Sequence, residues 1–140
     1  MSDKALANLA RIGKLKAEPP AQIEFDGLLR SGQRRLQDAE NATLHLESRF
    51  DLAYNAAHAL ALAALRWHGY RSENRYLVFQ CLAHTVALPN EQWRILDQAH
   101  RKRNLAEYEG EVDIDEGILA ALIRVAREVE NRVVKLTPLG

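Results

Sequence analysis

Residues 51–69 read DLAYNAAHALALAALRWHG, and this run contains seven alanines between residues 52 and 67. Its apolar character predicts a long helix over about 43–68, whose small side chains let neighbouring helices approach closely. Gly69 is expected to end that helix, because glycine readily adopts the left-handed conformation that follows many helix C-termini. The run is interrupted by Asn55 and His58 and is too short to cross a bilayer, so it predicts a helix of a folded domain and no membrane span.

The rest of the chain also shows helical patterns, and no segment reads as a strand. Helices are expected over about 3–16, 22–40, 73–87 and 89–107, and a last helix is expected to start near residues 113–116. Ser72 is expected to cap the 73–87 helix. Pro89 is expected to open the 89–107 helix, and Gly110 is expected to end it. Asp113 and Glu116 have the spacing of a capping box for the last helix. Helices with such short loops predict an all-α fold, an antiparallel four- to five-helix up-and-down bundle with an extra N-terminal helix.

Two regions are predicted, an N-terminal helical arm over 1–18 and a single bundle domain over 21–137, with the break at Pro19 and Pro20. The arm could dock on its own bundle, cover a partner in a dimer, or stay mobile. Docking is favoured, because a solitary short amphipathic helix is marginally stable in water. The arm lacks an aromatic anchor, which argues against a membrane-surface role.

The composition indicates one globular domain, with 47% hydrophobic and 27% charged residues in a chain of 140. Nineteen Lys and Arg balance nineteen Asp and Glu, so no overall positive field attracts nucleic acid, and any such contact must come from a local patch. The single cysteine, Cys81, excludes an internal disulfide and a zinc site built from several thiolates, and neither a metal nor a cofactor is expected. We see no signal peptide and expect a cytoplasmic protein.

A second informative segment, HRKRNLAEYEG, covers residues 100–110. Arg103 falls on the apolar stripe of Leu96, Ala99 and Ala106, where an inward-facing helix surface is expected. Arginine is almost never buried without a partner, so this side chain must reach solvent, find a carboxylate or line a cleft. The simplest alternative is a basic helix end in which Glu107, one turn away, is the partner.

The pair Arg103-Asn104, placed after the alanine-rich helix, resembles the signature of the HEPN superfamily of small helical domains. In that family an arginine, often followed by a polar residue such as asparagine, precedes a histidine by four to six intervening residues. Tyr108 stands at the closing position here. The resemblance covers roughly residues 42–136. It implies a homodimer whose two motif segments meet in a two-fold cleft that cleaves RNA without metal. It also suggests a nucleotidyltransferase-type antitoxin partner, for which Tyr108 would be a nucleotidylation target.

Candidate catalytic residues are Arg103, Asn104 and Tyr108, with His100 or His58 as a stand-in for the absent motif histidine, and Arg101 is a further candidate for ligand binding. His100 precedes Arg103 by one helical turn. His58 forms a polar stripe with Asp51 and Asn55, which either faces solvent or faces the same cleft as Arg103.

Two classes of function remain open at this point, besides a purely structural role. The favoured hypothesis is an RNA- or nucleotide-binding domain with little or no catalysis, because a tyrosine of ordinary pKa is a poor general base at neutral pH. The alternative is a toxin-type, metal-independent endoribonuclease that acts as a homodimer. Whether the chain is an enzyme is therefore left undecided by the sequence.

Overall fold

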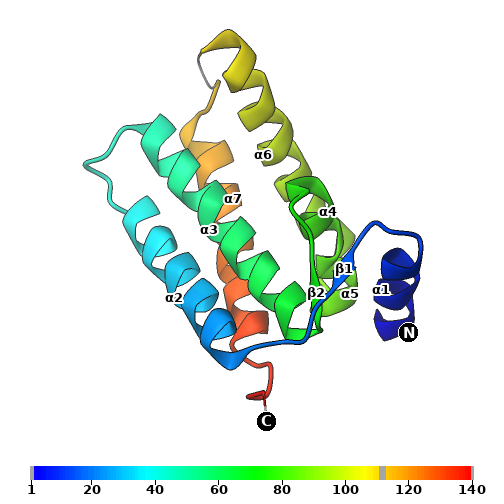
Figure 1. Cartoon of the computed structure of the whole chain (residues 1–140). Coiled ribbons are helices and arrows are strands. Elements are labelled where there is room, and N and C mark those ends of the chain that lie inside the picture. Colours follow the sequence, from blue (N-terminus) through cyan, green and yellow to red (C-terminus); the bar gives the residue numbers. More distant parts are fainter. Residues whose placement is uncertain (1, 111–112, 140) are drawn as a thin grey trace.

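Four long helices of alternating direction form the body of the protein, and the computed structural model describes residues 2–110 and 113–139. These are α2 (Gln22–Ala39), α3 (Leu46–Trp67), α6 (Asn90–Glu109) and α7 (Glu116–Val133). Figure 1 shows α2 and α6 running in one direction and α3 and α7 in the other. The predicted all-α antiparallel bundle is therefore confirmed.

The alanine-rich helix α3 lies at the centre and packs mainly on α2 and α7. Its alanines at the contact surfaces are almost fully buried, and Leu60 and Leu65 have no exposed surface. Gly32 of α2 lies directly against this helix, because a Cβ atom there would stand 2.6 Å from Cγ of Leu60 and 3.3 Å from the carbonyl oxygen of Ala56. Small residues on both helices thus permit the closest contact in the bundle, between α2 and α3.

The segment between α3 and α6 contains two short helices, α4 (Arg75–Gln80) and α5 (Leu82–Thr85), so the prediction of one helix over 73–87 is wrong. Asn74 is the N-cap of α4, since its side chain accepts a hydrogen bond from the backbone N–H of Leu77 at 3.1 Å. Ser72, the predicted cap, instead accepts from the N–H of Asn74 and shapes the turn before the helix. The α4 helix lies between α3 and α6 and positions one side of the candidate site.

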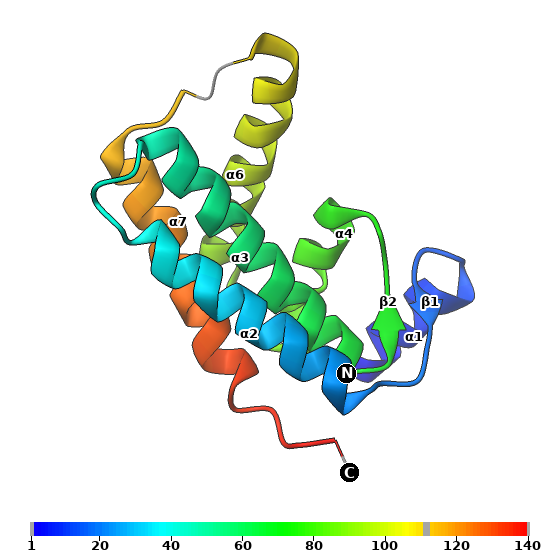
Figure 2. The same ribbon diagram turned by 60° about the vertical axis from the view of Figure 1, so that its left-hand side comes forward.

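The N-terminal arm contains α1 (Ser2–Arg11) and the two-residue strand β1 (Lys16–Ala17), which pairs antiparallel with β2 (Tyr70–Arg71). The expected helix over 3–16 is therefore too long, and the expectation of no strand is wrong at this one point. Gly13 adopts a φ of +81°, which turns the chain after α1. Leu6 and Leu15 are buried, α1 packs on α5, and Figure 2 shows β1 and β2 side by side next to α1. The arm docks on its own bundle.

A buried arginine, unnoticed in the sequence, joins the arm to the bundle. Arg66, near the end of α3, is only 1% exposed. Its guanidinium group donates to the carbonyl oxygens of Glu18 and Pro19 at 3.0 and 2.8 Å and to the carboxylate of Glu24 at 2.6 Å. The buried guanidinium group and the carbonyl oxygens of the segment that links the arm to α2 therefore have hydrogen-bond partners inside the protein.

The remaining helix ends follow the sequence closely. Gly69 and Gly110 both have positive φ, +90° and +79°, as expected after α3 and α6. The N-cap of α7 is Asp115, which accepts from the N–H of Ile118 at 2.8 Å, so the capping box predicted from Asp113 is wrong. Within the described ranges 2–110 and 113–139, no helix combines the length and apolarity that crossing a membrane requires.

Candidate functional site

Most of the predicted site residues lie on the face formed by α3, α4 and α6, around the buried side chain of Tyr54. The hydroxyl of Tyr54 lies 2.9 Å from Nδ1 of His100. The two rings are stacked, with centroids 6.2 Å apart, and Tyr76 and Phe79 of α4 complete an aromatic cluster around His100. The site therefore rests on core residues of three helices.

Arg103 extends over the Tyr54 ring, with its guanidinium carbon 4.9 Å from the ring centre. Its Nε lies 3.3 Å from a carboxylate oxygen of Asp51, and one terminal nitrogen lies 3.5 Å from a carboxylate oxygen of Glu107. Together with Glu47 and other residues these groups line a cavity of about 190 Å³. Of the three environments predicted for Arg103, two are found, because this side chain has carboxylate partners and lines a cavity. Glu107, the partner expected from the sequence, is one of its two acidic partners.

Arg75, the first residue of α4, belongs to the same site and was not anticipated. Its guanidinium carbon lies 5.6 Å from the centre of the Tyr54 ring, and one nitrogen donates to the side-chain oxygen of Asn55 at 2.9 Å. Within the part of the chain that the structure describes, no carboxylate forms an ion pair with Arg75. One sequence signal existed, because a cation at the first position of a helix is disfavoured by the helix dipole.

The stripe of Asp51, Asn55 and His58 on α3 faces α4 and α6, since Asp51 contacts Arg103 and Asn55 contacts Arg75. The solvent-facing alternative is therefore wrong for Asn55 and His58, whereas the side chain of Asp51 contacts Arg103 and is also 58% exposed. His58 lies deeper, edge-on to Phe79, and its Nε2 is buried without a hydrogen-bond partner. Burial, reinforced by the positive charges of Arg75 and Arg103, lowers the pKa of His58 to about 4. This histidine is neutral at physiological pH.

His100 is held at both ring nitrogens, by Tyr54 at Nδ1 and by the amide nitrogen of Asn104, which lies 3.1 Å from Nε2. Burial is the main cause that lowers the pKa of His100 below its usual range; Arg103 and Arg75 lower it further, and Asp97 opposes them. The result is a neutral imidazole beside Arg103, with Nε2 on the side of the exposed Asn104.

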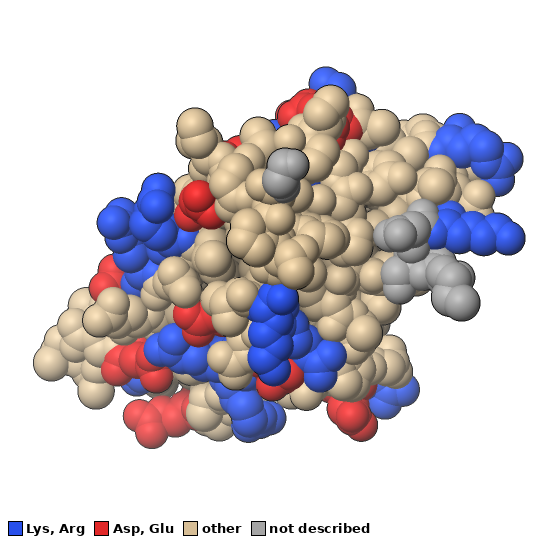
Figure 3. Space-filling view, turned by 90° about the horizontal axis from the view of Figure 1, so that it is seen from below, with Lys and Arg blue, Asp and Glu red and all other residues tan. Residues whose placement is uncertain are grey.

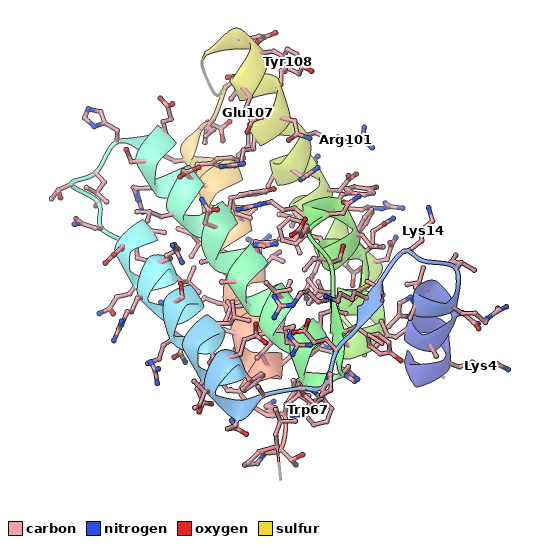
Figure 4. All side chains as sticks on the ribbon, viewed as in Figure 1. Lys4, Lys14, Trp67, Arg101, Glu107 and Tyr108 are labelled. Carbon is pink, nitrogen blue, oxygen red and sulfur yellow. The ribbon has the colours of Figure 1, made fainter. Side chains whose placement is uncertain are left out.

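Arg101 and Tyr108 point away from this cluster. Tyr108 is 92% exposed, and the Arg101 side chain is largely exposed and bonded to Asp97 at 3.2 Å. Figure 4 shows Glu107 on the side of α6 near α3, while Tyr108 and Arg101 project from its other side. With about 3.6 residues per turn, Arg103 and Tyr108 emerge in different directions from one helix. The structure therefore brings Arg103, Asn104 and His100 together on one side of α6 and leaves Tyr108 outside the cavity that Arg103 lines.

The charge around Arg103 is divided into two flanks. The flank toward Glu47, Asp51 and Glu107 is acidic. On the other flank Arg75 donates to Asn55, and no carboxylate of the described residues forms an ion pair with it. Among the described residues, no group of three or more His, Cys, Asp or Glu side chains is arranged to hold a metal ion. The arrangement can accept an anion on the Arg75 side and can hold a neutral imidazole next to it.

No family model, no curated protein and no solved structure matches this chain.

Proposed function

We propose that this protein is an HEPN-like RNA- or nucleotide-binding domain with little or no catalysis, and that the face around Tyr54 is its ligand site. The observation that carries the proposal is that the guanidinium groups of Arg75 and Arg103 both lie against the ring of Tyr54, and that among the described residues only Arg103 has a carboxylate partner. Two neighbouring cations repel each other unless an anion lies between or beside them. A phosphate group is the anion that two planar guanidinium groups bind best.

The polar residues around these arginines suit a nucleotide ligand. Asn104 is exposed beside His100 and offers an amide to a phosphate or a base. Tyr108 and Arg101 project from the neighbouring surface of α6, where a tyrosine ring can stack on an unpaired base. The acidic flank formed by Asp51 and Glu107 repels phosphate, so the ligand approaches from the Arg75 side.

Catalysis is expected to be weak because Tyr108, at the closing motif position, is exposed and lies apart from Arg103. Cleavage of RNA by its own 2′-hydroxyl requires a general base for that hydroxyl and a cation for the developing phosphorane charge. Arg75 and Arg103 supply cations. Tyr108 is too far from these cations to act as the base beside them.

Metal-independent endoribonuclease activity is the second candidate, and His100 is the observation in its favour. This imidazole is neutral near pH 7 and lies on the same face of α6 as Arg103. It would accept the 2′-hydroxyl proton through Nε2 once Asn104 turns away. His58, by contrast, is enclosed against Phe79 and has no such access.

Both candidates are tested by measuring binding and cleavage separately. Fluorescence anisotropy with a labelled oligouridine measures binding, and electrophoresis of the same RNA, kept in EDTA, measures cleavage. We expect binding that is weakened by Arg103→Lys, which keeps the charge but loses the planar fork, and little cleavage. Cleavage that is abolished by His100→Ala, while binding persists, would establish the second candidate instead. Absence of both binding and cleavage would leave only a structural role.

We also propose a cytoplasmic homodimer, in which α6 lies near the two-fold axis. Leu105 is 54% exposed on this helix, so the helix offers apolar surface to a second copy. Light scattering should give twice the mass of the 15.8 kDa chain, and a monomer at micromolar concentration would contradict it. A nucleotidyltransferase-type antitoxin remains the proposed protein partner, with Tyr108 as its accessible target.

A further inference from the structure

The exposed surface of the N-terminal arm is positively charged. Between residues 4 and 16 it carries four cations, Lys4, Arg11, Lys14 and Lys16, and no Asp or Glu. All four are exposed, and among the residues whose side chains the structure describes, only Lys16 has a carboxylate within 4 Å, at 3.7 Å from Glu18. Because the whole chain is neutral, the remainder is net negative. The arm is therefore the local basic patch that a neutral protein needs to attract a polyanion.

The cations are presented from a fixed position. Leu6 and Leu15 are buried against the bundle, β1 pairs with β2, and Arg66 binds the carbonyl oxygens of Glu18 and Pro19. The charged side chains therefore stand on an ordered surface of the bundle, and ligand binding does not have to order the arm first.

The arm and the outer surface of α6, beside the candidate site, lie along the same edge of the molecule. In Figure 4, Lys4 and Lys14 on the arm and Arg101 on α6 all project along one edge, on which the exposed Tyr108 also lies. Figure 3 shows the lower face, and at its right-hand end, over α1, the described charged groups are Lys and Arg. A chain of phosphates that leaves the site past Arg101 can continue toward the arm.

We infer that the basic face of the arm is a second phosphate-binding surface, and that the ligand is consequently a single-stranded RNA of several nucleotides. This inference rests on the proposed function and narrows it, because a mononucleotide would reach only one of the two surfaces. Lys and Arg side chains that follow a flexible phosphate backbone are typical of single-strand binding surfaces.

An anionic membrane is the other polyanion that a basic amphipathic helix can bind. Such a helix inserts its apolar face into the lipid. Here the apolar face of the arm is already buried against the bundle, since Leu6 has no exposed surface and Leu15 is 4% exposed. On the described part of the arm, Ile12 is the large apolar side chain that is mainly exposed, at 59%. The observations favour RNA.

The test compares the triple variant Lys4→Gln, Arg11→Gln and Lys14→Gln with a control that removes the same charge elsewhere. Arg30, Arg34 and Arg35 are exposed on α2, on the opposite side of the bundle in Figure 1, and their replacement by Gln is the matched control. Anisotropy is measured with oligouridines of about 4 and about 20 nucleotides over a range of salt concentrations. Circular dichroism verifies that both variants are folded.

Each phosphate contact to single-stranded RNA steepens the dependence of log K on log salt by about 0.7. The arm variant should therefore lower the slope for the long oligomer by about 2 and leave the short oligomer almost unchanged. The control should leave both slopes unchanged. An equal effect of the arm variant and the control would show a general charge effect and overturn the inference.

Two further outcomes separate the inference from the proposed function. If Arg75→Gln weakens binding but the arm variant does not, the ligand site stands and the arm surface is refuted. If neither oligomer binds, the proposed function fails, and the inference fails with it. Loss of binding to phosphatidylserine vesicles in the arm variant, with RNA binding unchanged, would assign the arm to membranes and likewise overturn the inference.

Discussion

The hydroxyl of Tyr54 on α3 and Nδ1 of His100 on α6 are 2.9 Å apart, and this bond joins the protein core to the candidate site. Tyr54 is only 1% exposed, and its ring also lies beneath Arg103 and Arg75. One buried side chain therefore fixes the imidazole and supports both guanidinium groups. Its hydroxyl and its ring can be tested separately.

Tyr54→Phe removes the hydroxyl and keeps the ring. We expect a loss of about 1 kcal/mol in the free energy of unfolding, the usual net value of one hydrogen bond, and little change in RNA binding. Urea denaturation of the single variants and of the double variant with His100→Ala measures the coupling of the pair. Independent, additive effects of the two substitutions would contradict the bond.

The protein should lose stability as the pH falls from about 6.5 toward 4, because of His58. In this range the unfolded chain takes up a proton at His58 and the folded chain does not, since burial lowers the pKa in the folded state to about 4. We expect a loss of about 1 to 2 kcal/mol between about pH 7.5 and pH 5, reduced by partial solvent screening. Urea denaturation of His58→Leu should show a smaller loss. An identical pH dependence in both proteins would refute the assignment.

Arg66 should be far more important for stability than its neighbour Arg71, although both bind Glu24. Arg66→Met leaves the carbonyl oxygens of Glu18 and Pro19 without their donor and should cost about 3 kcal/mol or more. Arg71→Met removes a side chain that is 31% exposed and should cost less than about 1 kcal/mol. Denaturant midpoints of the two variants measure the contrast, and equal midpoints would contradict it.

Tyr108 should contribute to RNA binding through its ring rather than through its hydroxyl. Tyr108→Ala should weaken binding by about 1 to 3 kcal/mol, the usual contribution of one stacked base, while Tyr108→Phe should bind like the natural protein. Tyr108→His, which restores the family motif, tests catalysis in the same assay. A gain of metal-free cleavage in that variant would show that only a proton carrier was missing.

The fold was predictable because its main signals are local. Helix α3 is specified by the alanine-rich run itself. The ends of α3 and α6 are marked by single glycines, Gly69 and Gly110. The break between α4 and α5 and the pairing of β1 with β2 depend on contacts between distant segments, which periodicity does not record.

The site was only partly predictable for the same reason. Arg103, Asn104 and His100 share one helix, so their spacing placed them together. Arg75 meets Tyr54 only because α4 packs between α3 and α6, and Arg66 is buried only because the arm crosses it. Neither contact leaves a periodic pattern in the sequence. The opposite directions of Arg103 and Tyr108, however, follow from helix geometry alone and could have been foreseen.

The most direct test of the central claim is the affinity of Arg75→Gln for single-stranded RNA, measured by anisotropy at low salt beside Arg30→Gln. Arg75 is the guanidinium group of the site that has no carboxylate partner among the described residues, whereas Arg30 removes the same charge from α2. The account predicts that Arg75→Gln weakens binding by about 10-fold or more and that Arg30→Gln leaves it nearly unchanged. Equal affinities of both variants and the natural protein would contradict a phosphate site around Tyr54.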